Sequence, residues 1–144
     1  MMDKTNQHHK SVDLANLYNI RNQLLNSNNK ETNLDKGLEW INIKEKFVMQ
    51  LILEAFVDPE KKKILNLTSD QALTVPEILG ICNIPTTSGY RIINSLEKNG
   101  LLVKSYIDKI KNGKKITKYR SIFDNVQIKI EKNDISIKAK FAKI

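Results

Sequence analysis

Hydrophobic residues recur at steps of three and four through the middle of the chain, the spacing that gathers side chains on one face of an α-helix. The first such stretch, residues 43–56, predicts an amphipathic helix that ends before Asp58. Pro59 suits the first turn of a second helix, with Asp58 as its N-cap. A third helix is predicted to begin after Thr74, because Glu77 completes a capping box with it. Its apolar side is expected to contain Val75, Ile78, Leu79 and Ile81.

A fourth helix is predicted over about residues 86–99, after the turn that Pro85 imposes. Thr86 or Thr87 is expected to cap this helix, and Asn99-Gly100 to end it in the left-handed conformation. The sequence therefore predicts two consecutive helices joined by a short turn. The apolar face of the second is expected to hold Ile93 and Leu96.

Alternating polar and apolar residues mark two hairpins after this helix. Residues 102–107 and 118–123 are expected to pair across Asn112-Gly113, with a flexible tip between them. The second hairpin has strands around 126–130 and 135–141, each apolar on one face, joined by a polar turn. A lone two-stranded hairpin is marginal in water, so its apolar face needs cover from its own domain or from a second subunit.

The chain of 144 residues is long enough for one domain with a core and too short for two of ordinary size. Its net charge of +8 is uneven, because residues 109–144 hold eleven basic and three acidic side chains while the remainder is balanced. This local excess of positive charge favours a polyanionic partner. The alternative interpretation is that these basic side chains only contact water. With one Trp, four Tyr and four Phe there is little aromatic surface for stacking bases, which favours duplex over single-stranded nucleic acid.

The outward side of the fourth helix carries the residue types that contact DNA. Arg and Asn side chains can reach the edges of G and A in a bidentate manner, while hydroxyl groups and Tyr usually contact phosphates. The alternative is that this side is the solvent face of a core helix. The candidate DNA contacts on the helix are Thr86, Thr87, Ser88, Tyr90, Arg91, Asn94 and Lys98. Those in the basic segment are Lys109, Lys111, Lys114, Lys115, Lys118 and Arg120.

Other classes of protein have little support in the sequence. The single cysteine, Cys82, cannot form an internal disulfide or a thiolate metal cluster and is expected to be a small buried residue in a reducing cytoplasm. No run approaches the roughly 18 apolar residues of a membrane span, and the N-terminus lacks an apolar signal core. We find no Gly-rich phosphate loop and no Cys-His or Ser-His-Asp motif, so we expect no enzyme, no cofactor and no metal site.

A family likeness rests on four segments within residues 56–123. They are Phe56-Val57-Asp58-Pro59-Glu60-Lys61-Lys62-Lys63-Ile64-Leu65, Leu73-Thr74-Val75-Pro76-Glu77-Ile78, Thr87-Ser88-Gly89-Tyr90-Arg91-Ile92-Ile93 and Leu96-Glu97-Lys98-Asn99-Gly100-Leu101. This pattern resembles the ArsR-like winged-helix regulators, particularly archaeal ones. The resemblance implies that residues 86–99 are a recognition helix, that the loop Lys109 to Lys118 is the wing, and that a homodimer binds a pseudo-palindrome. Metal-sensing members use paired cysteines or His and carboxylate sets, which Cys82 alone does not match.

Together these observations predict an α+β fold, mainly α: a winged helix-turn-helix with a β-hairpin wing and an additional C-terminal β-hairpin. We expect a flexible Asn-rich segment over residues 1–40, the winged helix-turn-helix with its leading helix over 41–123 and the hairpin extension over 124–144. The predicted function is that of a sequence-specific regulator of transcription that binds double-stranded DNA. Helix 86–99 would enter the major groove and the basic wing, about 106–120, would lie on the backbone. The alternative is a winged-helix module that binds another protein within a larger assembly.

Overall fold

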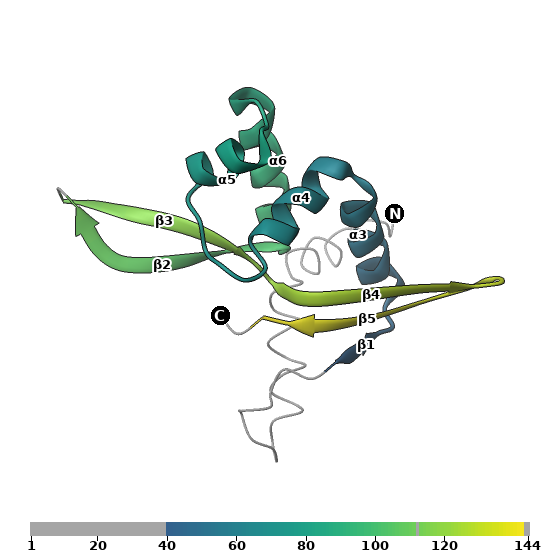
Figure 1. The fold of residues 1–144 in the computed structure, drawn as a ribbon. Coiled ribbons are helices and arrows are strands. Elements are labelled where there is room, and N and C mark those ends of the chain that lie inside the picture. Colours follow the sequence, from purple (N-terminus) through teal and green to yellow (C-terminus); the bar gives the residue numbers. More distant parts are fainter. Residues whose placement is uncertain (1–39, 112, 143–144) are drawn as a thin grey trace, which may run out of the picture.

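The computed structural model of the chain describes residues 40–111 and 113–142, apart from the side chains of 106–111 and 114 (Figure 1). Nearly all of the segment predicted as flexible, residues 1–40, lies outside the described residues. The helices are α3 (Lys46–Val57), α4 (Pro59–Leu67), α5 (Val75–Cys82) and α6 (Thr86–Lys98). The strands are β1 (Ile41–Ile43), β2 (Leu102–Lys111), β3 (Lys114–Ser121), β4 (Phe123–Glu131) and β5 (Asp134–Phe141).

Two helices begin as their cap residues predict. The Asp58 carboxylate accepts hydrogen bonds from the backbone amides of Glu60 and Lys61, at 3.0 and 3.2 Å, with Pro59 in the first turn of α4. The Thr74 hydroxyl accepts from the Glu77 amide at 3.3 Å, and the Glu77 carboxylate accepts from the Thr74 amide at 2.9 Å. The capping box at the start of α5 is therefore confirmed. At the N-termini of both α4 and α5, the cap side chain accepts hydrogen bonds from backbone amides that lack a partner inside the helix.

Two details of the helices differ from prediction. The N-cap of α6 is Pro85, and neither Thr86 nor Thr87 caps the helix with its side chain, because the helix already begins at Thr86. Ile81, expected on the apolar side of α5, is exposed, whereas Cys82 one residue later is buried as predicted. Because neighbouring residues on a helix point about 100° apart, the inward face ends between these two positions.

The predicted leading helix is shorter than expected at its start. Ile41 to Ile43 form strand β1 instead, which pairs antiparallel with β5 in the register Ile43↔Ile137 and Ile41↔Ala139. The sheet has the strand order β1-β5-β4, so the predicted C-terminal hairpin is present with a third strand added. Ile43 is buried against this sheet, and helix α3 begins three residues later.

The hairpin formed by β2 and β3 is paired much further out than predicted. Its register runs from Leu102↔Ser121 at the base to Lys111↔Lys114 at the turn, with an irregularity after Ile107. Gly113 takes a positive φ of 76° in that turn, a conformation that favours glycine. The segment expected as a flexible loop is therefore mostly strand. Tyr119 also forms a bridge with Leu73, which lies just before α5 and ties the hairpin to the helices.

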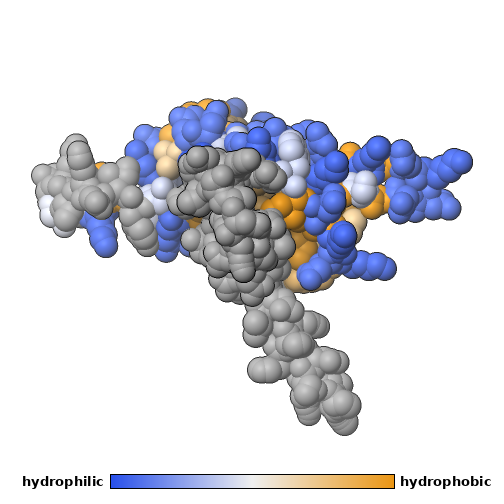
Figure 2. Space-filling view, turned by 90° about the horizontal axis from the view of Figure 1, so that it is seen from below, coloured by the Kyte–Doolittle hydropathy of each residue, from blue (hydrophilic) through white to orange (hydrophobic). Residues whose placement is uncertain are grey.

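One hydrophobic core joins the helices to both hairpins. Residues from α3, α4, α5, α6, β2 and β5 contribute to a single buried cluster, and the Phe123 and Phe141 rings lie 5.3 Å apart at the base of the C-terminal hairpin. This hairpin thus packs in cis at its base. Further out, hydrophobic side chains remain visible between hydrophilic ones along its arm, on the right of Figure 2.

The fold is a mixed α+β arrangement with antiparallel strands. The helices, of 12, 9, 8 and 13 residues, and the strands, of 3, 10, 8, 9 and 8, contribute similar lengths, so the expected excess of helix is not seen in the described residues. The two hairpins extend in opposite directions, with the helices on one side of both (Figure 1).

Candidate nucleic-acid interface

Helix α6 is held against α5 by a turn and by a close approach of the two helices. Asn83 ends α5 in the left-handed conformation, with φ 60°, and Ile84 is buried beneath the turn. Gly89 of α6 then faces Leu79 of α5, where a Cβ atom would lie 2.5 Å from Leu79 Cδ2. Because no other residue type fits that gap without a shift, Gly89 sets the spacing of the helix pair.

The outward face of α6 carries most of the predicted contact residues. Ile93 and Leu96 are buried, as predicted, while Tyr90 is 45% exposed. Ser88 is half-buried, with its hydroxyl 3.4 Å from the Pro85 carbonyl oxygen. The predicted residues that are exposed on this helix are Thr86, Thr87, Tyr90, Arg91, Asn94 and Lys98. Those from Thr87 to Lys98 follow steps of three and four, so they form one continuous face opposite the core.

The basic residues of the β2–β3 hairpin are divided by their surroundings. Lys115 is exposed and Lys118 is half-buried. Lys109, Lys111 and Lys114 lie in the paired strands, and their side chains are outside the described residues. The hairpin leaves the helical body beneath α5 and α6 and projects to one side (Figure 1). The structure therefore attaches this basic arm directly beside the helix pair.

Arg120 differs from the other predicted contacts. Its guanidinium Nη2 donates a hydrogen bond to the Ser69 carbonyl oxygen at 3.1 Å, and its Nε is buried with no hydrogen-bond partner among the described residues. Ser69 lies in the segment between α4 and α5. One residue later, the Ser121 amide donates to the Thr68 carbonyl at 3.0 Å. Part of the Arg120 guanidinium is thus used to hold β3 to the helical body.

Glu97 is a residue of this region that sequence reasoning missed. Its carboxylate lies 3.5 Å from the Lys104 ammonium and 3.4 Å from the Tyr119 hydroxyl, which donates to it. Glu97 stands near the end of α6, while its two partners lie on β2 and β3. It therefore links the candidate recognition helix to the basic hairpin. The sequence shows only that Glu97 is an acidic residue near basic ones. The fold is needed to identify its partners on β2 and β3.

Two ionisable groups of α5 have shifted pKa values. The hydrogen bond from the Thr74 amide lowers the pKa of the Glu77 carboxyl, and the positive charge of Lys118 acts in the same direction. Burial raises the pKa of the Cys82 thiol, against the effect of the Lys63 charge. Glu77 is thus held ionised at the end of α5 nearest Lys118, and Cys82 is held as a neutral thiol in the core.

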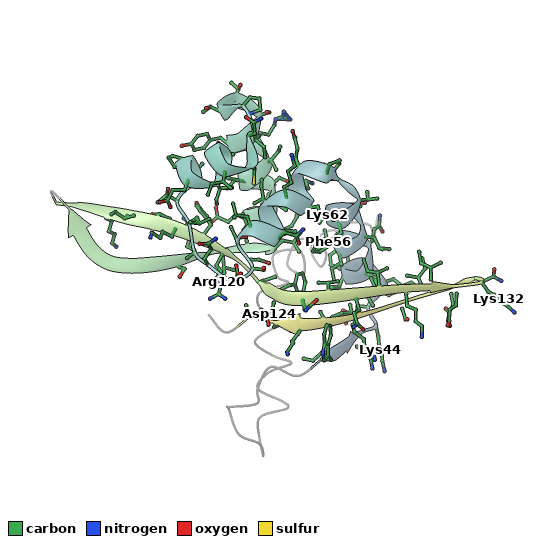
Figure 3. The ribbon with its side chains drawn as sticks, in the orientation of Figure 1. Lys44, Phe56, Lys62, Arg120, Asp124 and Lys132 are labelled. Carbon is green, nitrogen blue, oxygen red and sulfur yellow. The ribbon has the colours of Figure 1, made fainter. Side chains whose placement is uncertain are left out.

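A separate cleft of about 370 Å³ lies away from α6, between α3, α4 and the start of β4. Its walls include Phe56, Lys62, Leu65, Asp124, Val126 and Ile128, and no lining residue belongs to α5 or α6. Figure 3 shows Phe56 and Lys62 above the start of β4, where Asp124 lies. The described residues hold no cluster of three or more His, Cys, Asp or Glu side chains that could bind a metal ion.

Comparison with protein-family models, with curated proteins and with solved structures gives no match to this chain. Within the described residues, no helix has both the length and the apolar character needed to cross a lipid bilayer.

Proposed function

We propose that this protein is a sequence-specific double-stranded-DNA-binding regulator of transcription, with a winged helix-turn-helix built from α4, α5, α6, β2 and β3. The observation that carries the proposal is the exposed polar face of α6, opposite buried Ile93 and Leu96 and next to a basic hairpin. An α-helix fits the major groove, and a positively charged arm beside it suits the phosphate backbone. The resemblance of residues 56–123 to ArsR-like regulators points in the same direction.

The residues have distinct roles in this proposal. Arg91 and Asn94 read base edges, because their side chains can form bidentate hydrogen bonds with G and A. Thr86, Thr87, Ser88 and Tyr90 near the start of α6 contact phosphates and fix the position of the helix. Lys98 and the lysines of the hairpin supply the electrostatic attraction that does not depend on sequence. The protein acts as a homodimer on a pseudo-palindromic site.

The proposal is tested by selecting genomic DNA fragments that the full chain binds in the presence of competing random duplex, and sequencing them. We expect a motif with two inverted half-sites to be enriched. Arg91→Glu should abolish the enrichment, because it places a negative charge where the helix meets the groove. Lys44→Glu is the matched control, since Lys44 is exposed and lies between β1 and α3, away from α6 (Figure 3). If the parent protein enriches no motif, or if both variants behave alike, the proposal is wrong.

A second candidate function is a winged-helix module that binds an acidic protein partner through the same basic hairpin. Ile81 on α5 favours it, because 62% of this large apolar residue is exposed beside the helix pair. The same selection distinguishes the two functions, because a protein-binding module would retain no preference among duplexes once random DNA competes.

A further inference from the structure

Strand β4 has an open edge. In the order β1-β5-β4, strand β5 pairs with one side of β4, and no strand of the described residues pairs with the other. The cleft between the helices and the start of β4 is lined by Phe56, Lys62 and Leu65 on one side and by β4 on the other, whereas further out along β4 Ile128 and Ile130 are exposed. Such an edge presents unpaired backbone amide and carbonyl groups, which are a template for another strand. Proline, which would block pairing, is absent from β4.

The outer half of this hairpin also has an uncovered apolar face. At its base, Phe123 and Phe141 are buried in the core. Further out, Ile128 is 37% exposed and Ile130 is 69% exposed, and Ile135, which pairs with Ile130, is 40% exposed. A continuous apolar strip beside an open strand edge indicates an interaction surface.

We infer that this edge is the dimer interface, with β4 paired antiparallel to β4 of a second copy around a two-fold axis at Ile128. The two sheets then form one continuous sheet, and backbone hydrogen bonds between the two β4 strands add to the burial of the isoleucines. Ile128 faces its own counterpart, and Val126 of each copy faces Ile130 of the other. The charges at the two ends are opposite as well, because Asp124, at the irregular start of β4, lies toward Lys132, in the turn that follows β4 of the second copy.

Other registers are less favourable. An axis at Gln127 would place Ile130 opposite Asp124, and an axis at Lys129 would place two Lys129 ammonium groups together. An axis at Ile130 would pair only residues 129–131 of the two strands, because β4 ends at Glu131 and the chain turns back there into β5. Two like charges directly across a pair of strands are unfavourable, and so is a charge opposite an apolar residue. The axis at Ile128 avoids both kinds of pair, so it is the register in which β4 is complementary to a second copy of itself.

The inference deepens the proposed function, since a dimer brings two α6 helices to one duplex, but the interface exists without DNA and can be measured alone. We expect the full chain to be dimeric by light scattering and analytical ultracentrifugation at micromolar concentrations. Ile130→Lys should weaken the dimer about tenfold or more, because each dimer loses two buried apolar contacts. Ile81→Lys is the matched control, since it introduces the same charge at an exposed isoleucine of α5. A monomer, or a dimer that Ile130→Lys leaves intact, overturns the inference.

Cysteine cross-linking tests the register with substitutions that leave the charge unchanged. In a Cys82→Ala background, Ile128→Cys should form a disulfide-linked dimer under mild oxidation, because directly opposite Cβ atoms lie about 4.5–5.5 Å apart. Ile130→Cys is the control, since its counterpart is four positions away along the paired strands and out of reach. Equal or greater cross-linking of the control would contradict the register.

Charge reversal tests the two ends of the interface. Asp124→Lys alone should weaken the dimer, because it places lysines together at both ends. Combining it with Lys132→Asp should restore the dimer, and a failure to restore it would contradict the pairing. A dimer that binds no DNA would refute the proposed function and leave this interface standing. A monomer that binds a single half-site would refute this interface and the homodimer, and would leave standing the binding of duplex DNA by α6.

Discussion

Gly89 of α6 lies directly against the side chain of Leu79 in α5. A Cβ atom on Gly89 would stand 2.5 and 2.6 Å from the two Leu79 methyl carbons and 3.1 Å from Cγ. Both residues are buried, so the space cannot be relieved by turning the leucine toward solvent. Glycine is ordinarily the weaker choice inside a helix, which means that its presence in α6 reflects packing rather than helix formation.

This contact predicts opposite effects for two glycine-to-alanine changes. Gly80→Ala should stabilise the protein by about 0.5–1 kcal/mol, because Gly80 lies within α5 with no atom close to its Cβ position. Gly89→Ala gains the same helix propensity, but overpacking typically costs about 1–3 kcal/mol, so we expect a net loss of up to about 2 kcal/mol. Urea unfolding of both variants measures the difference. Equal stabilisation by both would show that α5 and α6 are not in close contact at Gly89.

The capping box at α5 predicts a dependence of stability on pH. The pKa of the Glu77 carboxyl in the folded state lies below its ordinary value of 4.5, so folding favours the ionised form. This contribution is complete above that value and is lost as the pH falls through the lower, folded-state pKa. Glu77→Gln cannot ionise. The stability gap between parent and variant should therefore be greatest near neutral pH and shrink in acid. A gap that stays constant from neutral pH to strong acid would contradict the role of the charge.

Arg120 is predicted to matter for folding more than for DNA binding. Removing its hydrogen bond to the Ser69 carbonyl should cost about 1–2 kcal/mol in Arg120→Ala, since bonds from charged donors contribute more than neutral ones and this residue is half-buried. Arg120→Lys retains the charge, so it should bind DNA like the parent while still losing stability. Urea unfolding and the salt dependence of DNA affinity separate the two effects. A fully stable Arg120→Ala with a shallower salt dependence would make Arg120 a phosphate contact instead.

Features set by neighbours along the chain were predictable from the sequence. The caps at Asp58 and Thr74 depend on side chains within three residues of the helix start, and both are confirmed. The turn at Gly113 and the buried positions Ile93 and Leu96 likewise follow from local spacing. Such features need only the geometry of a helix or a hairpin.

Features that depend on distant partners were not predictable. Ile43 continues the apolar spacing of α3, and only its pairing with Ile137 near the other end of the chain makes it part of a strand. The bond between Arg120 and Ser69 is of the same kind, because a basic residue in a basic segment gives no sign of a carbonyl partner many residues earlier. For the candidate interface, composition supplied the residue types, while their exposure and links to other elements required the fold.

The proposed roles of the helix and the hairpin predict two different binding defects. Arg91→Ala should relax preference at a single base pair, by about 1–3 kcal/mol, and leave affinity for random duplex nearly unchanged. Lys114→Ala combined with Lys115→Ala should weaken binding to every duplex and reduce the slope of log affinity against log salt by about two, since each neutralised phosphate contributes roughly 0.9.

The control for the lysine pair is Lys62→Ala combined with Lys63→Ala on α4. These two residues are exposed, and their removal lowers the net charge by the same amount on α4 rather than on the hairpin. Fluorescence anisotropy with the selected site and with random duplex, over a series of salt concentrations, measures all the variants. If the control pair changes the salt slope as much as the hairpin pair does, attraction comes from overall charge. Attraction by the overall charge of the protein does not require any particular lysine to contact a phosphate. The hairpin would then have no part in placing α6 in the groove.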